Sequence, residues 1–213
     1  MKTEELIALL ARHPEAMARP RPLLEWTLAL SVAVASAVAL MLLLLGPRAD
    51  LPLAIAQPLF WQKLGILGLF AIGALVWAHR AGIPGGQGGW RAGLRWAGPF
   101  WATAATLMTV LAAPTGGRGE LFWSPTAFWC LGMIPVLSAV PAVALIVLLQ
   151  RAAPTEPARA ARAAGMAAAS VGAVAYAFHC PADQPAYLLL VYGAAIAGTT
   201  LITQCLGTRW LRW

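Results

Sequence analysis

The chain contains little charge for its length. Of its 213 residues, 11% are Asp, Glu, Lys or Arg, whereas 60% are hydrophobic. Soluble globular domains carry about 25% charged residues. The few charges stand in short clusters between long apolar runs. This pattern excludes an ordinary soluble domain and indicates one membrane-embedded domain for the whole chain.

Acidic residues are fewer than basic ones, which leaves a net charge of +7. A DNA-binding protein needs a basic face on an exposed fold, whereas these Arg residues flank hydrophobic segments. We therefore expect no direct nucleic-acid partner. The opening sequence MKTEEL also lacks the short apolar core and cleavage site of a signal peptide. We expect the first transmembrane helix to direct insertion.

The usual marks of catalysis and transport are missing as well. An ionisable residue deep inside the membrane is the default sign of a proton or ion path, but the deep helix positions hold no Asp, Glu, Arg or His. HExxH, GxSxG and phosphate-binding glycine loops are absent. The glycine-rich run at 82–90 is interpreted as a flexible linker. The sequence thus predicts neither an enzyme nor a required cofactor.

What the chain has instead is six apolar stretches of membrane-spanning length. Crossing about 30 Å of hydrocarbon takes about 20 helical residues. We predict an all-α bundle of six transmembrane helices, in a domain at 26–206, between a cytoplasmic tail at 1–25 and a short one at 207–213. We expect Lys63, near the start of its segment, to reach the nearby interface with its ammonium group. The predicted spans are 26–45, 58–78, 96–113, 126–149, 162–178 and 186–206.

The basic residues predict the orientation of this bundle. Twelve of the 15 Lys and Arg residues fall in the N-terminal tail, in the loops after the second and fourth spans, or at the C-terminus. Only Arg48, Lys63 and Arg118 fall on the opposite side. Cytoplasmic loops carry the excess of Lys and Arg. We therefore expect both termini in the cytoplasm. The fifth span is rich in Ala, so we expect it to pack between other helices.

Two of the three cysteines share the face opposite the basic one. Cys130 lies at the outer end of the fourth span, and His179 and Cys180 lie at the outer end of the fifth, close to Asp183. In bacteria this face is periplasmic, and paired thiols there can form a disulfide. Thiolate and imidazole are also ligands for copper, zinc and similar ions. The alternative is that both cysteines only pack as small hydrophobic residues, which we expect for Cys205.

The N-terminal tail has the pattern of a short amphipathic helix. Thr3 can cap it, Leu6, Ile7, Leu9 and Leu10 form an apolar stripe, and Pro14 ends it. Such a short helix is marginal in water by itself. We therefore expect it to bind either the membrane surface or a groove in a protein partner.

With these residues in view, the chain resembles the NrsF family of bacterial membrane anti-sigma factors over nearly its full length. The resemblance rests on the MKTEELIALLA opening, the six-helix layout, Trp61-x-Lys63, Cys130, the segment FHCPADQPAYLLLVYG and the ending GTRWLRW. It implies a multi-pass protein of the inner membrane that holds an extracytoplasmic-function (ECF) sigma factor away from RNA polymerase.

The resemblance also implies roles for particular residues. Cys130 and Cys180 correspond to periplasmic cysteines associated with sensing heavy metals or oxidants, through a regulatory metal ion or a disulfide. The apolar stripe of the tail, together with Arg91 and Arg95 of the loop after the second span, is the expected sigma-binding surface.

Two alternatives remain open from the residues alone. A small membrane transporter or metal-handling protein would use the cysteines as transit ligands, although its helix interiors would be unusually apolar. A membrane thiol oxidase would normally rely on a Cys-x-x-Cys motif, which is absent. The sequence leaves open the inducing signal and the oligomeric state.

Overall fold

The computed structural model describes Thr3, residues 22–83 and residues 125–211. The part of the chain that it describes is helical and contains no strand. The sigma-binding residues expected in the tail and at Arg91 and Arg95, and the predicted span at 96–113, lie outside the described residues. The elements are α2 (Pro22–Leu44), α3 (Leu51–Ala54), α4 (Pro58–Ala81), α7 (Pro125–Ala152), α8 (Pro157–Ala177), α9 (Pro185–Tyr187), the π-helix η2 (Leu188–Tyr192) and α10 (Gly193–Trp210).

Proline defines where most of these helices begin. Five of them, α2, α4, α7, α8 and α9, have Pro as their first residue. Proline suits this position because its fixed φ is already helical and its missing N–H would have no partner within the helix. The described part of α2 begins at Pro22, four residues before the predicted Trp26.

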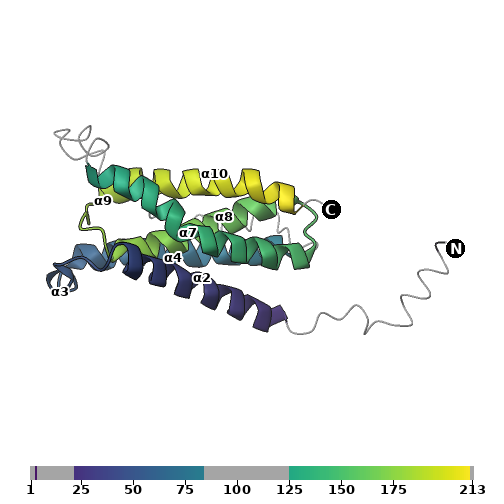
Figure 1. Cartoon of the computed structure of the whole chain (residues 1–213), viewed down its shortest axis with the longest axis horizontal. Coiled ribbons are helices and arrows are strands. Elements are labelled where there is room, and N and C mark those ends of the chain that lie inside the picture. Colours follow the sequence, from purple (N-terminus) through teal and green to yellow (C-terminus); the bar gives the residue numbers. More distant parts are fainter. Residues whose placement is uncertain (1–2, 4–21, 84–124, 212–213) are drawn as a thin grey trace.

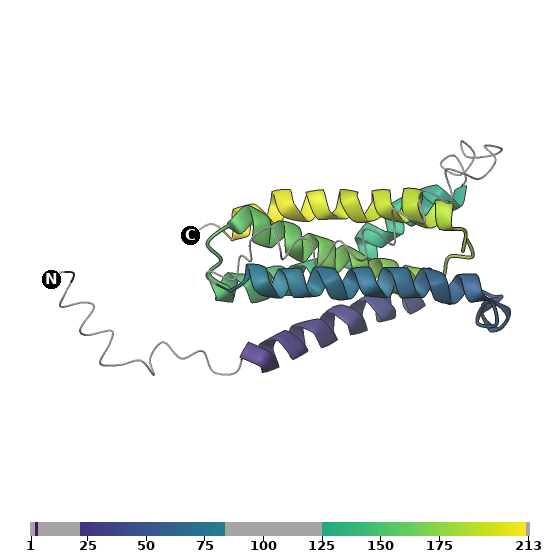
Figure 2. The same ribbon diagram turned by 180° about the vertical axis from the view of Figure 1, so that it is seen from behind.

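The long helices form a bundle around α8 (Figures 1 and 2). Helices α4, α7 and α10 pack along α8, and α2 packs mainly on α7. Most residues of α8 are buried, including the run from Ala167 to Ala169. This confirms the prediction that the Ala-rich span packs between other helices, because small side chains let neighbouring backbones approach closely.

Two glycines of α8 show how close that approach is. A Cβ on Gly165 would meet Thr200 and Thr203 of α10, and one on Gly172 would meet Ser138 and the Ile134 carbonyl of α7. At these two positions the small residues of α8 serve close helix packing. On α10, by contrast, the space beside Gly193 and Gly198 is open in the described part of the bundle.

Helix α7 is bent along its length, as Figure 1 shows. It carries Pro135 and Pro141 inside the helix, and an internal proline removes a backbone hydrogen bond and clashes with the preceding turn. The bend lets one helix contact α10, α8 and α2.

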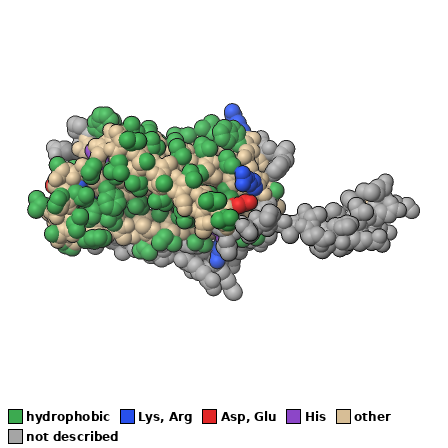
Figure 3. All heavy atoms as spheres, turned by 60° about the horizontal axis from the view of Figure 1, so that its bottom comes forward, with side chains coloured by type: hydrophobic (Ala, Val, Ile, Leu, Met, Phe, Trp, Pro, Cys, Tyr) green, Lys and Arg blue, Asp and Glu red, His purple; other side chains and the backbone are tan. Residues whose placement is uncertain are grey.

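The two ends of the bundle differ in charge. We call the end where α4, α7 and α10 finish the basic end, because it holds the described residues Arg80, Arg151, Arg159, Arg162 and Arg209. The opposite end, where α4, α7 and α9 begin, is the cysteine end. Figure 3 shows a largely hydrophobic face between the ends, with most of its Lys and Arg near one end.

Four described segments are long and apolar enough to cross a membrane: 24–44, 58–81, 126–152 and 185–210. They correspond to four of the six predicted spans. The fifth predicted span, 162–178, is helical as α8 but is not among these four. Large hydrophobic side chains are exposed along the outside, such as Leu43 at 81%, and exposed apolar surface of this extent marks a membrane or partner contact.

Candidate functional site

The cysteine end is organised around the carboxylate of Asp183. Its Oδ1 lies 2.8 Å from the Lys63 ammonium, and its Oδ2 lies 2.8 Å from a guanidinium nitrogen of Arg48. The Asp183 side chain is 9% exposed, Lys63 1% and Arg48 6%. A buried charge must be paired and hydrogen-bonded to be tolerated, so these three residues form one structural unit, which we call the Asp183 clamp.

Lys63 uses all three of its N–H donors inside the protein. Besides Asp183, it donates to the carbonyl oxygens of Cys180 at 2.9 Å and Ala182 at 3.2 Å. Its ammonium also lies 5.6 Å from the ring centre of Tyr192. The prediction that Lys63 reaches out to the interface is therefore wrong. An ammonium has three donors, and the turn at 180–183 satisfies all of them.

The same turn is tied to the end of α2. The backbone N–H of Arg48 donates to the carbonyl of Phe178 at 3.0 Å, and a ring nitrogen of His179 lies 2.9 Å from the Gly46 carbonyl. Gly46 has a φ of +71°, a left-handed conformation that glycine adopts without steric cost. The clamp therefore joins α2, α4 and the connection between α8 and α9.

Arg48 also holds the exposed Asp50 through two bonds of 2.7 Å. This hydrogen-bonded ion pair lowers the pKa of the Asp50 carboxyl below its usual value and raises that of the Arg48 guanidinium. Both groups are therefore charged at every physiological pH, so neither Arg48 nor Asp50 acts as a pH switch.

The two cysteines predicted as a site lie at this same end of the bundle. Cys130 and Cys180 are fully buried in one hydrophobic cluster. Both are free thiols. Three tyrosines belong to the same cluster: Tyr176, Tyr187 and Tyr192. The ring centre of Tyr192 lies 5.9 Å from that of Tyr176 and 6.1 Å from that of Tyr187, distances at which aromatic rings attract each other.

Two hydroxyl groups in this aromatic cluster are poorly satisfied. The Oη atoms of Tyr187 and Tyr192 are buried and make no hydrogen bond of ordinary length and angle to any described residue. Leaving such a group unsatisfied costs about 1–3 kcal/mol. Unpaired buried hydroxyls in a native structure call for an explanation, of which a functional role is one.

The predicted site residues thus fall into two groups. Cys130 and Cys180 are buried in one hydrophobic cluster, whereas Asp183 and His179 are engaged in holding the turn. The described residues contain no group of three or more His, Cys, Asp or Glu placed to hold a metal ion, so Cys130, Cys180 and His179 are not a ready-made metal site. Cys205 is exposed on α10, so it does not pack in the interior as expected.

Sequence reasoning missed the partnership of Arg48 and Lys63 with Asp183. A signal existed, because a Lys inside an apolar span needs a counter-ion, and Asp183 falls at the same end of the bundle. The contacts join residues 120 and 135 positions apart, and local patterns carry no such information.

Fold and site together define a helical bundle with four described segments long and apolar enough to cross a membrane, and with a buried polar clamp at one end. Comparison with known proteins then identifies the family of this bundle. Residues 10–213 match the NrsF family, described as "Negative regulator of sigma F", and the chain belongs to this family.

Two curated relatives align over the whole chain and over their own full length. The "Probable anti-sigma-F factor NrsF" of Azospira oryzae is 35% identical, and the "Anti-sigma-F factor NrsF" of Caulobacter vibrioides is 31% identical. No solved structure matches the chain.

Proposed function

We propose that this protein is an anti-sigma factor of the bacterial inner membrane. It binds an ECF sigma factor on its cytoplasmic side and releases it when Cys130 and Cys180 respond to a heavy metal or an oxidant. The observation that carries the proposal is full-length membership of a family of negative regulators of sigma F.

The separation of the two ends supports a signalling role. The thiols lie at the cysteine end, whereas α2 begins and α4 ends at the basic end, next to the tail and the loop expected to bind sigma. Helix α4 has 24 residues and is about 36 Å long. A signal must therefore pass along the helices, and both α2 and α4 run from one end to the other.

The Asp183 clamp offers a route for this coupling. Lys63 of α4 holds the carbonyl of Cys180 itself, and Arg48 ties the same turn to the end of α2. A metal or a disulfide at the Cys180 sulfur changes the position that the 180–183 turn prefers. Since Lys63 and Arg48 follow this turn, the change biases the packing of α2 and α4 together.

The unpaired tyrosine hydroxyls fit the same role. A neutral thiol is a weak hydrogen-bond acceptor, whereas a thiolate that binds metal carries negative charge. The Tyr187 and Tyr192 hydroxyls donate more strongly to sulfur after that change, so they favour the signalled state over the resting one. A ligand shifts an equilibrium only by its differential affinity for the two states.

The energy required is small. Tenfold weaker binding of sigma corresponds to about 1.4 kcal/mol of coupling between the two sites. One charge-assisted hydrogen bond contributes about 1.5–3 kcal/mol. A single new contact at the cysteine end is therefore sufficient.

The test has two steps. First, a tagged chain in native membranes is used to co-purify its sigma factor, with and without a thiol-reactive metal ion such as Cd²⁺. We expect retention without the ion and release with it. Second, Cys130→Ser and Cys180→Ser are expected to retain sigma but to lose release, while Cys205→Ser, the matched control, behaves as wild type.

The outcomes separate the parts of the proposal. If no sigma factor is retained by the wild-type chain, the anti-sigma function is wrong. If both serine variants still release sigma normally, sensing takes place elsewhere. Deleting residues 1–12 is expected to free the sigma factor without any signal, and unchanged retention would move the binding surface to loop residues such as Arg91 and Arg95.

A further inference from the structure

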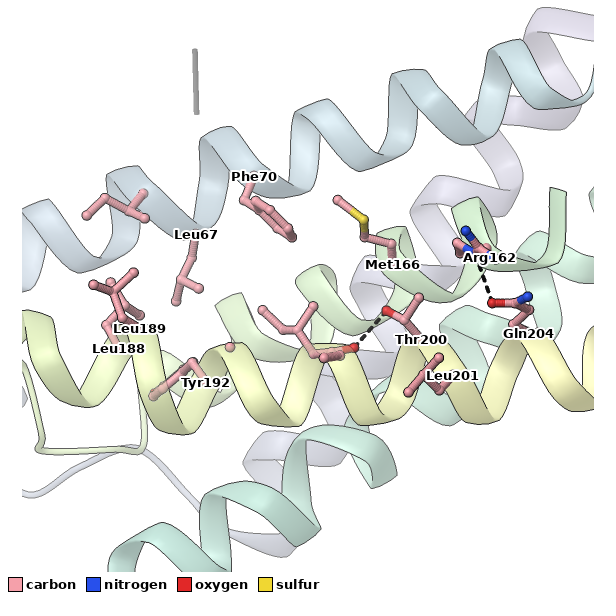
Figure 4. Close-up of a pocket in the computed structure, with 14 residues that line it drawn as sticks. Leu67, Phe70, Arg162, Met166, Leu188, Leu189, Tyr192, Thr200, Leu201 and Gln204 are labelled. Carbon is pink, nitrogen blue, oxygen red and sulfur yellow. Dashed lines mark hydrogen bonds between the residues drawn. The ribbon is translucent and has the colours of Figure 1, made fainter. Parts of the chain in front are cut away.

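Two apolar surfaces stand out in the described part of the bundle. One is a groove of about 480 Å³ between α4 and α10, with Leu67, Phe70 and Leu201 among its walls (Figure 4). Its walls on these two helices lie within segments apolar enough to cross a membrane, 58–81 and 185–210, where apolar side chains are expected. The other surface is the connection between α2 and α4, to which that reason does not apply.

This connection, residues 45–57, lies between two segments that are long and apolar enough to cross a membrane, 24–44 and 58–81. The first of them has 21 residues, which as a helix is about 31 Å long. The hydrocarbon of a bilayer is about 30 Å thick, so the connection begins where the hydrocarbon ends. Figures 1 and 2 show its short helix α3 at the outer edge of the cysteine end.

Large apolar side chains are exposed on this connection even so. Leu53 of α3 is 71% exposed, and Ile55 and Trp61 on either side of the start of α4 are exposed as well. The indole N–H of Trp61 donates to the carbonyl of Ile55 at 2.8 Å, which holds Trp61 against the connection. We call Leu53, Ile55 and Trp61 the hairpin patch. Exposed apolar surface of this kind marks a contact with a membrane or a partner.

The surroundings of the hairpin patch favour the boundary of the bilayer as its partner. Three exposed leucines at the end of α2, residues 42–44, precede the connection directly, so exposed apolar side chains continue from a membrane-spanning segment into the connection. Trp is enriched where the membrane meets water, because its ring is apolar and its N–H is polar. Apolar side chains at this depth are buried between the headgroups and the acyl chains.

The charges of the connection favour contact with acyl chains over contact with charged headgroups. Arg48 and Asp50 are its only charged residues, and they bind each other through two bonds of 2.7 Å. The connection therefore carries no net charge, whereas attraction to anionic lipid requires a cluster of Lys and Arg. Its contact with the bilayer depends on apolar area and not on the charge of the lipid.

We propose that the connection between α2 and α4 is an interfacial anchor, which inserts Leu53, Ile55 and Trp61 into the leaflet at the cysteine end. The anchor rests on the membrane location proposed above, but neither on sigma binding nor on sensing by the cysteines. Arg48 binds Asp50 of the connection and also Asp183 of the clamp. The anchor therefore fixes the depth of the Asp183 clamp in the membrane.

Spin labels on the full chain in phosphatidylcholine vesicles test this anchor. In a Cys205→Ser background, a nitroxide is attached to Leu53→Cys, to Gln57→Cys or to Leu69→Cys, and a protein without an added cysteine is the blank, since Cys130 and Cys180 are buried. Collisions with oxygen, which concentrates in hydrocarbon, are compared with collisions with a water-soluble nickel chelate. Ile55→Cys gives a second reading of the patch if the Leu53 variant does not fold.

The expected order of depth separates the anchor from simple position along the chain. Leu69 is exposed at the middle of α4, so its label should meet oxygen and not the chelate. Gln57 is polar, exposed and next to α4, so position along the chain predicts that its label lies deeper than that of Leu53. The anchor predicts the reverse, with Leu53 deeper than Gln57, and no change when anionic phosphatidylglycerol is added.

Each other outcome overturns the anchor in a recognisable way. A Leu53 label no deeper than the Gln57 label shows that the patch faces water. A Leu53 label that meets neither reagent is covered by protein, and spectral broadening between labels on two chains assigns the patch to a second copy. Release of the Leu53 label from the membrane unless phosphatidylglycerol is present would make headgroup charge the cause. A Leu69 label that meets the chelate would instead refute the membrane location itself.

Discussion

Replacing Asp183 by Asn is the sharpest test of the clamp. The substitution keeps the shape of the side chain and removes its charge. Lys63 is 1% exposed and would then keep only two carbonyl oxygens and a neutral amide as partners. Breaking a buried ion pair by removing one partner costs about 3–5 kcal/mol. Because the amide oxygen still accepts one hydrogen bond, we expect a loss near 3 kcal/mol.

The matched control is Asp50→Asn. Asp50 binds the same Arg48 through two bonds of 2.7 Å, shorter than the bond of Asp183 to that residue. It is, however, 49% exposed, and exposed ion pairs contribute little because water and salt screen them. Bond length alone would predict a larger effect at Asp50, whereas burial predicts a much larger effect at Asp183.

The measurement is the free energy of unfolding of purified protein in detergent micelles, from titration with a denaturing detergent. The double variant Lys63→Gln with Asp183→Asn removes both charges, so we expect it to be more stable than Asp183→Asn alone. If Asp183→Asn costs no more than Asp50→Asn, the Asp183 carboxylate is hydrated and the clamp does not hold the turn.

Two further predictions use the same unfolding measurement. Tyr187→Phe and Tyr192→Phe are expected to be neutral or stabilising by about 1 kcal/mol, because each removes a buried hydroxyl without a partner, and a clear loss of stability would reveal a partner for it. Gly172→Ala is expected to cost about 1–3 kcal/mol, because its Cβ would collide with Ser138 of α7. Gly132→Ala, with open space around it, should be neutral or slightly stabilising, and an equal cost at both positions would contradict the close contact.

Much of the fold was predictable because the relevant signals are local. Hydropathy located four segments that the structure shows as long apolar helices, and α8 was expected to be internal because Ala-rich sequence suits close packing. The uneven distribution of basic residues likewise predicted two different ends, and the described Arg residues divide as expected. These features depend on composition over one segment, which a single sequence contains.

The site was predictable only in part. The placement of Cys130 and Cys180 at one end of the bundle followed from topology, since two crossings return the chain to the end where it started. The roles of Asp183 and His179 did not follow, because each depends on a partner more than 110 residues earlier in the chain. A sequence pattern indicates that a buried charged residue needs a partner, but it does not indicate which distant residue the fold brings next to it.

What the sequence alone determined is therefore the position of the four apolar helices that the structure describes and the end of the bundle at which Cys130 and Cys180 lie. The tertiary structure decided that Lys63 turns inward, that Asp183 joins α2 and α4 to the turn beside Cys180, and that a groove stays open between α4 and α10. The physical reason is that hydrophobic burial follows from local composition, whereas a buried charge is placed by the one distant group that neutralises it.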